Sequence, residues 1–153
     1  MVYNGDIYFG DKQEDKKMAV VEELIRIEEN GTISFGNHKL AEKTKKSDFE
    51  FMGDLYKVKT FNEITKLEKN GSMVYESVPG TAVNEFSYND GDVEFKVEAD
   101  VDSQITLELE SGTEYTLFIN GVNAGKMKSN LSGKLTLSIE AADGQTTVKI
   151  VKA

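Results

Sequence analysis

The chain contains one histidine, His38, in the segment 36–39, whose glycine and asparagine are typical of a turn. A single imidazole cannot form a metal site that needs several histidines. The residues around it also lack a serine and an aspartate in an arrangement typical of a Ser-His-Asp triad. We therefore expect His38 to lie at the surface, without a catalytic or metal-binding role.

Carboxyl groups are the most abundant reactive side chains, with 27 aspartates and glutamates. Two of them about 5–10 Å apart could act as acid and base in glycan hydrolysis. Most, however, alternate with apolar residues along predicted strands, which places them on a solvent-exposed face. The segments 89–92 and 100–103 offer oxygen atoms that suit Ca²⁺, but neither has the full spacing of a calcium-binding loop. We interpret both as turns, and we expect no catalytic residue, no metal and no cofactor.

Aromatic side chains are the remaining candidates for ligand contact, because the apolar faces of sugars stack on aromatic rings. The chain has no tryptophan, six tyrosines and eight phenylalanines. The candidate ligand-binding residues are Tyr75, Tyr88, Tyr115 and Phe118, with Tyr56 as a further platform. Aromatic residues on strands more often belong to the core, which is the competing interpretation for each of them.

Phe118 differs from the other candidates in its place within the alternation. Tyr115, Leu117 and Ile119 fall on one face of a predicted strand, whereas Phe118 falls on the other. In a sheet with one buried face, Phe118 is therefore exposed. It needs a cover, a ligand or a partner subunit.

The overall charge and hydropathy limit the classes of partner. The formal net charge is -9, with 18 basic residues against 27 acidic ones, and no lysines interleave with aromatic residues along the sequence. We therefore expect no nucleic-acid partner. Because no apolar run approaches the ~20 residues of a spanning helix and the N-terminus lacks a secretory signal pattern, we expect no membrane insertion. The sequence as written predicts a cytoplasmic protein, with export by another route left open.

Strict alternation of apolar and polar residues marks the last third of the chain. The alternating segments are 104–110, 114–119, 134–140 and 147–151. Pairs that favour tight turns, such as Asn120 with Gly121, separate some of them. This third therefore predicts four to five antiparallel strands that follow one another. Earlier in the chain we expect strands at 49–51, 55–58, 85–88 and 93–97, and a polar connector at 41–47.

The segment 61–69 favours a short helix, since Phe61, Ile64 and Leu67 lie three residues apart and Thr60 with Glu63 forms a capping-box pattern. The following Asn-Gly pair suits a helix cap, although it is also a strong hairpin signal. The segment belongs to a near-repeat, because residues 23–35 match residues 63–75 at four of thirteen positions. Duplication and chance similarity both stay open, as does the structure of residues 20–29.

The runs 55–61, 63–71 and 74–83 resemble a group of short clostridial proteins that often carry the label "endosialidase". The likeness continues through 104–110 and spans about residues 18–153. More loosely, residues 113–121 are similar to the closing β-sandwich modules of glycoside hydrolases and polysaccharide lyases. Sialidases hold the sialic acid carboxylate with several arginines, whereas this chain has only one, Arg26. We therefore interpret the likeness as one to a non-catalytic part of such enzymes.

These observations predict a mainly β fold, an antiparallel β-sandwich or two packed small sheets with at most one or two short helices. We expect residues 1–17 to be a leader, or an arm that adds a strand to a neighbouring subunit. Residues 18–83 and 84–153 would form two β units packed as one domain. The predicted function is a non-catalytic binding or assembly module that self-associates through edge strands. Alternatives are a carbohydrate-binding accessory module and a carboxylate-based glycan hydrolase or lyase.

Overall fold

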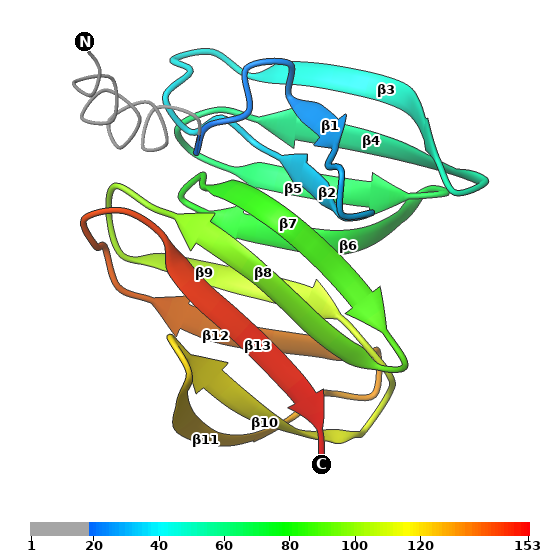
Figure 1. Cartoon of the computed structure of the whole chain (residues 1–153), viewed down its shortest axis with the longest axis vertical. Coiled ribbons are helices and arrows are strands. Elements are labelled where there is room, and N and C mark those ends of the chain that lie inside the picture. Colours follow the sequence, from blue (N-terminus) through cyan, green and yellow to red (C-terminus); the bar gives the residue numbers. More distant parts are fainter. Residues whose placement is uncertain (1–18) are drawn as a thin grey trace, which may run out of the picture.

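The computed structural model describes residues 19–153, which form thirteen strands and no helix. The strands build two antiparallel sheets that pack face to face as a β-sandwich (Figure 1). The predicted mainly β, two-sheet architecture is therefore confirmed. The leader or arm predicted at 1–17 lies outside the described residues.

One sheet has seven strands. In spatial order they are β1 (Ile25–Ile27), β2 (Ile33–Phe35), β7 (Ala82–Asn89), β8 (Asp92–Glu98), β13 (Thr146–Lys152), β10 (Glu114–Ile119) and β11 (Val122–Lys128). The other sheet has six strands: β12 (Lys134–Ile139), β9 (Ser103–Glu108), β6 (Ser72–Val78), β5 (Thr65–Lys69), β4 (Asp54–Thr60) and β3 (Thr44–Phe51). The expected connector at 41–47 is shorter than predicted, because β3 already begins at Thr44.

One hydrophobic core fills the space between the sheets, with residues from both. At its centre the ring of Tyr75 packs edge-on against Phe35, at 5.2 Å between centroids, and against Phe95, at 5.7 Å. Such edge-to-face packing is the favoured arrangement of aromatic pairs. The predicted boundary between residues 83 and 84 falls inside β7, and both sheets combine strands from both halves of the chain.

The predicted helix at 61–69 is wrong, because residues 65–69 form β5, which pairs with β4 and β6. Thr65 and Leu67 are buried while their neighbours are more exposed, so the period in the structure is two. Asn70 and Gly71 adopt positive φ angles of 50° and 85°, as a two-residue hairpin turn requires. The pairing satisfies the backbone groups of β5 on both edges, which outweighs the weak three-residue spacing.

Both copies of the near-repeat form hairpins, but the hairpins differ. Ile27 pairs with Ile33 across a longer loop in the seven-stranded sheet, whereas its counterpart Leu67 pairs with Tyr75 in the six-stranded sheet. Residues 25–27, left open by the sequence, are thus a short strand. In the described part of the chain, no helix has the length and apolar character that a membrane crossing requires.

Candidate functional site

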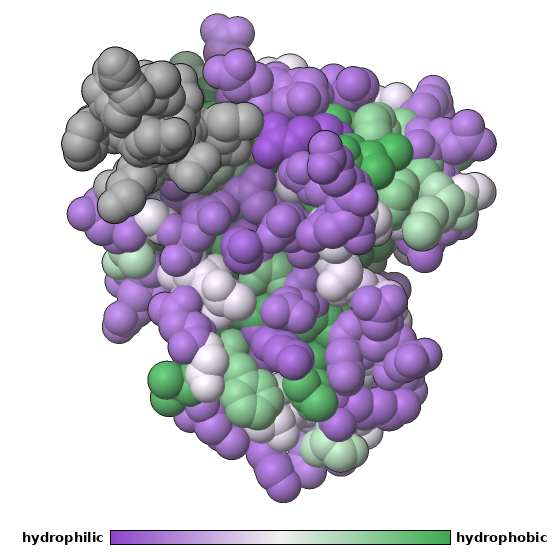
Figure 2. All heavy atoms as spheres, viewed as in Figure 1, coloured by the Kyte–Doolittle hydropathy of each residue, from purple (hydrophilic) through white to green (hydrophobic). Residues whose placement is uncertain are grey.

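A groove of about 420 Å³ lies at one end of the sandwich. The β3–β4 hairpin forms one wall, and the β1–β2 loop with the last residues of β7 forms the other. In Figure 1 these segments lie on the right-hand side of the molecule. In Figure 2 apolar surface lies over the β3–β4 hairpin, in an otherwise largely hydrophilic region.

Aromatic and apolar side chains line much of this groove. Tyr56 and Tyr88 both contribute to it, and Tyr88 is 47% exposed. Phe51 lies beside Tyr56, with ring centroids 6.1 Å apart, and Met52 at the hairpin tip is largely exposed. Burial raises the pKa of both tyrosines above the ordinary value, so each phenol keeps its proton and can donate a hydrogen bond.

Polar side chains complete the groove. Asp54 accepts a hydrogen bond of 2.9 Å from Nδ2 of Asn70, and its other oxygen lies 3.4 Å from Nζ of Lys69. The hydrogen bond from Asn70 and the charge of Lys69 hold the pKa of Asp54 below its ordinary value. Asn30 and Asn89 add amide groups to the lining. The groove therefore offers an ionised carboxylate, an ammonium group and amides beside two phenol rings.

Two of the predicted ligand-binding residues do not reach any surface. Tyr75 and Tyr115 are fully buried in the core. The hydroxyl of Tyr75 lies 2.7 Å from Oγ1 of Thr81, and the hydroxyl oxygen of Tyr115 accepts a bond of 3.1 Å from the backbone N–H of Glu110. Because a fully buried ring offers no face to a ligand, the prediction of a platform role for these two residues is wrong.

Phe118 lies on the outer face of the seven-stranded sheet, as the alternation predicts. It lines a shallow hollow of about 370 Å³ together with Glu94, Lys149 and Val151. Figure 2 shows apolar surface in this lower region, over β10 and β13. The four predicted residues are thus divided among the core, the end groove and this hollow, and the structure does not bring them together.

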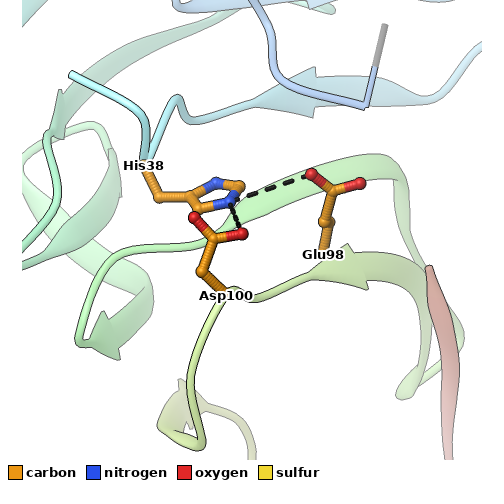
Figure 3. Close-up of side chains that lie close together, drawn as sticks. All are labelled: His38, Glu98 and Asp100. Atoms are coloured by element: carbon orange, nitrogen blue, oxygen red, sulfur yellow. Dashed lines mark ion pairs between the residues drawn. The ribbon is translucent and has the colours of Figure 1, made fainter. Parts of the chain in front are cut away.

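His38 is buried, contrary to the predicted surface position, with only 2% of its side chain exposed. The connection between β2 and β3 folds onto the core, because the backbone N–H of Asn37 donates to Oγ1 of Thr60 at 2.9 Å. Nε2 of His38 points toward two carboxylates, 3.4 Å from Oδ1 of Asp100 and 3.8 Å from Oε2 of Glu98 (Figure 3). Glu98 ends β8, and Asp100 follows it in the turn to β9.

The charge state of this cluster follows from its surroundings. Burial lowers the pKa of His38 below its ordinary value, although the carboxylate of Asp100 opposes the shift. Lys39 donates to both oxygens of Asp100, at 3.0 and 2.9 Å, and these hydrogen bonds lower the pKa of Asp100. At neutral pH a neutral imidazole therefore faces an ionised carboxylate.

The two segments considered for Ca²⁺ have different roles. Residues 89–92 make the β7–β8 turn, in which Asp90 and Gly91 have positive φ angles of 53° and 88°. Oδ1 of Asp92 accepts from the backbone N–H of Lys152 at 2.9 Å. In the second segment, Oδ1 of Asp102 accepts from the backbone N–H of Ala141 at 2.9 Å, whereas Asp100 belongs to the histidine cluster.

Lysines gather on the outer face of the six-stranded sheet, which the sequence did not indicate. Lys45 lies opposite Lys59 in the pairing of β3 with β4, and Lys59 lies opposite Lys66 in the pairing of β4 with β5. Lys57 lies nearby on the same strand as Lys59. We call these four lysines the lysine row. Strand pairing brings them together although they are separated in the sequence, so the sequence does not show that they are neighbours.

Comparisons of the chain with protein-family models, with curated proteins and with solved structures find no match.

Proposed function

We propose that the protein is a non-catalytic carbohydrate-binding module that holds a glycan in the end groove. The observation that carries this proposal is the placement of the half-exposed Tyr88 and of Tyr56 in one groove with amide and charged side chains. An aromatic ring accommodates the apolar face of a sugar, while amides, ammonium and carboxylate groups bond its hydroxyls. The groove volume of about 420 Å³ suits a ligand of one or a few sugar rings.

The ionisation of Asp54 supports binding over hydrolysis. A general acid in a glycosidase needs a carboxyl group whose pKa is raised, so that it keeps a proton to donate. The pKa of Asp54 is lowered by Asn70 and Lys69 instead. An ionised Asp54 suits a hydrogen-bond acceptor for sugar hydroxyls.

The contacts of Arg26 argue against recognition of sialic acid by the usual means. Its guanidinium lies 2.9 Å from Glu28 and 3.4 Å from Glu23. A guanidinium engaged by two carboxylates of its own chain is a poor receptor for a ligand carboxylate. The resemblance to proteins labelled "endosialidase" therefore supports a glycan-binding role at most, without sialidase activity.

The test is a glycan array followed by calorimetric titration with the glycans that are retained. We expect Tyr88→Ala and Tyr56→Ala each to weaken binding by about tenfold, because a stacked ring contributes roughly 0.5–1.5 kcal/mol beyond its buried area. Phe118→Ala is the matched control, since it removes a partly buried ring that lines the hollow on the outer sheet face. Absence of retention by any glycan would contradict the proposal, as would loss of binding in Phe118→Ala but not in Tyr88→Ala.

Self-association is a second candidate function, favoured by the free edge of β12. The other three edge strands of the described sheets are protected: β1 has three residues, and β3 and β11 both pair irregularly with their neighbours. By contrast, β12 pairs with β9 in unbroken register over six residues and contains no proline or glycine. Such a regular edge can pair with a second copy of itself.

Light scattering after size exclusion tests this candidate with two matched variants. Ser138→Lys adds a charge on β12, where the two copies would bring like charges together. Gln104→Lys adds the same charge at the residue opposite Ser138, one strand further inside the sheet. We expect Ser138→Lys to convert an oligomer to a monomer. We expect Gln104→Lys to leave the oligomeric state unchanged. A monomer in the wild type at high concentration would exclude association through β12.

A further inference from the structure

We propose that His38, Glu98 and Asp100 form a binding site for a divalent transition-metal ion, for which Zn²⁺ is the best fit. One ligand atom from each residue lies within 4.8 Å of the others. The three side chains come from two segments far apart in the sequence, and Figure 3 shows both carboxylates on the Nε2 side of the imidazole. The site is distinct from the end groove and uses none of its residues.

The separations fit shared ligands better than hydrogen bonds. Nε2 of His38 lies 3.4 Å from Oδ1 of Asp100 and 3.8 Å from Oε2 of Glu98. Hydrogen bonds from nitrogen to oxygen are about 2.7–3.2 Å long. Two ligand atoms at ~2.0–2.1 Å from a tetrahedral ion lie roughly 3.3–3.4 Å apart, and further apart when the angle at the ion opens. The two separations from Nε2 are therefore compatible with an ion that His38 shares with either carboxylate.

The buried imidazole is a second, independent indication of a ligand. The His38 side chain is 2% exposed, yet neither ring nitrogen makes a well-formed hydrogen bond to a described residue, and Nε2 lies as far as 3.4 Å from Oδ1 of Asp100. Buried polar groups are nearly always paired, because an unpaired one loses its bonds to water without replacement. Coordination by Nε2 satisfies one of the two nitrogens in the direction in which the carboxylates already lie.

The donor set selects the class of ion. One imidazole nitrogen and two carboxylate oxygens suit Zn²⁺ and its first-row neighbours, whereas Ca²⁺ takes oxygen ligands.

Lys39 competes with the ion for Asp100. Its ammonium group contacts both carboxylate oxygens, and its side chain is 55% exposed. An exposed lysine can swing into solvent, so the ion displaces it from at least one oxygen. Because Asp100 is itself 53% exposed, water can occupy the coordination positions that the three protein ligands leave open. Through His38 and Asp100, the bound ion would link the β2–β3 connection to the turn that follows β8.

The experiment titrates tag-free, chelator-treated full-length protein with Zn²⁺, and in parallel with Co²⁺ and Ca²⁺, by calorimetry. We expect one Zn²⁺ per chain, visible absorption from bound Co²⁺, and weaker binding of Ca²⁺. Asp100→Asn and Glu98→Gln should each weaken Zn²⁺ binding by at least about tenfold, whereas Lys39→Met should strengthen it. Glu29→Gln is the matched control, because it removes an exposed carboxylate from another part of the molecule.

The imidazole provides a direct readout that does not depend on the variants. His38 is the chain's only histidine, so its side-chain ¹⁵N signals are unambiguous in the intact protein. Zn²⁺ should shift the Nε2 signal and not merely broaden backbone signals of acidic residues. An unmoved Nε2 signal would overturn the proposal, as would equal affinity of Asp100→Asn and Glu29→Gln or preference for Ca²⁺. Loss of this site would leave the glycan proposal unaffected, because the groove residues are elsewhere.

Discussion

The hydroxyl of Tyr75 lies 2.7 Å from Oγ1 of Thr81 inside the core. Ser77 also bonds Oγ1 of Thr81, at 2.8 Å, and Thr65 exchanges bonds with the backbone of Thr81. All of these groups are buried. Thr81 follows β6 at the point where the chain crosses to the seven-stranded sheet, so this hydroxyl network ties the crossing to the six-stranded sheet.

The network predicts an order of stability for two isosteric variants. Tyr75→Phe removes one hydroxyl and leaves Thr81 bonded to Ser77, so we expect a loss of about 1 kcal/mol in the free energy of unfolding. Thr81→Val removes the shared partner and leaves two buried hydroxyls without it, so we expect a larger loss, about 2–3 kcal/mol. Urea unfolding measures both, and a smaller effect for Thr81→Val would contradict the network.

Gly133 and Gly31 allow a matched test of close backbone approach. Both have positive φ angles, of 83° and 82°, so alanine strains the backbone about equally at either position. A Cβ at Gly133 would lie 2.2 Å from the carbonyl oxygen of Leu109, whereas a Cβ at Gly31 would meet nothing within 4 Å. We expect Gly133→Ala to lower the free energy of unfolding by about 1–3 kcal/mol more than Gly31→Ala. Equal losses in urea unfolding would show that the close contact with the carbonyl oxygen of Leu109 tolerates the methyl group.

The lowered pKa of the Glu28 carboxyl predicts part of the loss of stability at acid pH. Burial by itself would raise the pKa of its carboxyl, but hydrogen bonds from Ser34 and Arg26 hold the pKa below the ordinary value of 4.5. Because the folded state favours the ionised form, this stabilisation is fully present above pH 4.5 and is lost as pH falls through the lower folded-state pKa.

The corresponding measurement is the free energy of unfolding of wild type and Glu28→Gln as a function of pH. The variant should be less stable at neutral pH, and the difference between the two proteins should narrow below pH 4.5. A difference that stays constant through the acid range would mean that Glu28 stabilises the fold through packing and not through its charge.

The lysine row predicts opposite effects of one charge reversal at two neighbouring positions. Lys59 lies opposite both Lys45 and Lys66, so Lys59→Glu replaces repulsion by attraction and should raise the free energy of unfolding by roughly 0.5–1 kcal/mol. Lys57 lies opposite Glu68, so Lys57→Glu should lower it. Both variants change the net charge equally. The two effects should shrink at 1 M salt, and effects of the same sign would contradict the register argument.

The sequence alone determined the strands and the faces of several residues. Alternation at 104–110 and 134–140 predicted β9 and β12, and it placed Phe118 on the outer face. These predictions succeeded because the side-chain period of a strand is a local property of its backbone. The three-residue spacing at 61–69 misled because only three apolar residues carried it, while the Asn-Gly turn that follows was the stronger local signal.

The tertiary structure decided which strands pair and which side chains from distant segments become neighbours. The consecutive strands of the last third divide between the sheets, since β9 pairs with β12 whereas β10 pairs with β11 and β13. The end groove, the lysine row and the cluster around His38 all join residues from distant segments. Their positions depend on sheet order and register, which the packing of the whole core fixes and which no local spacing records.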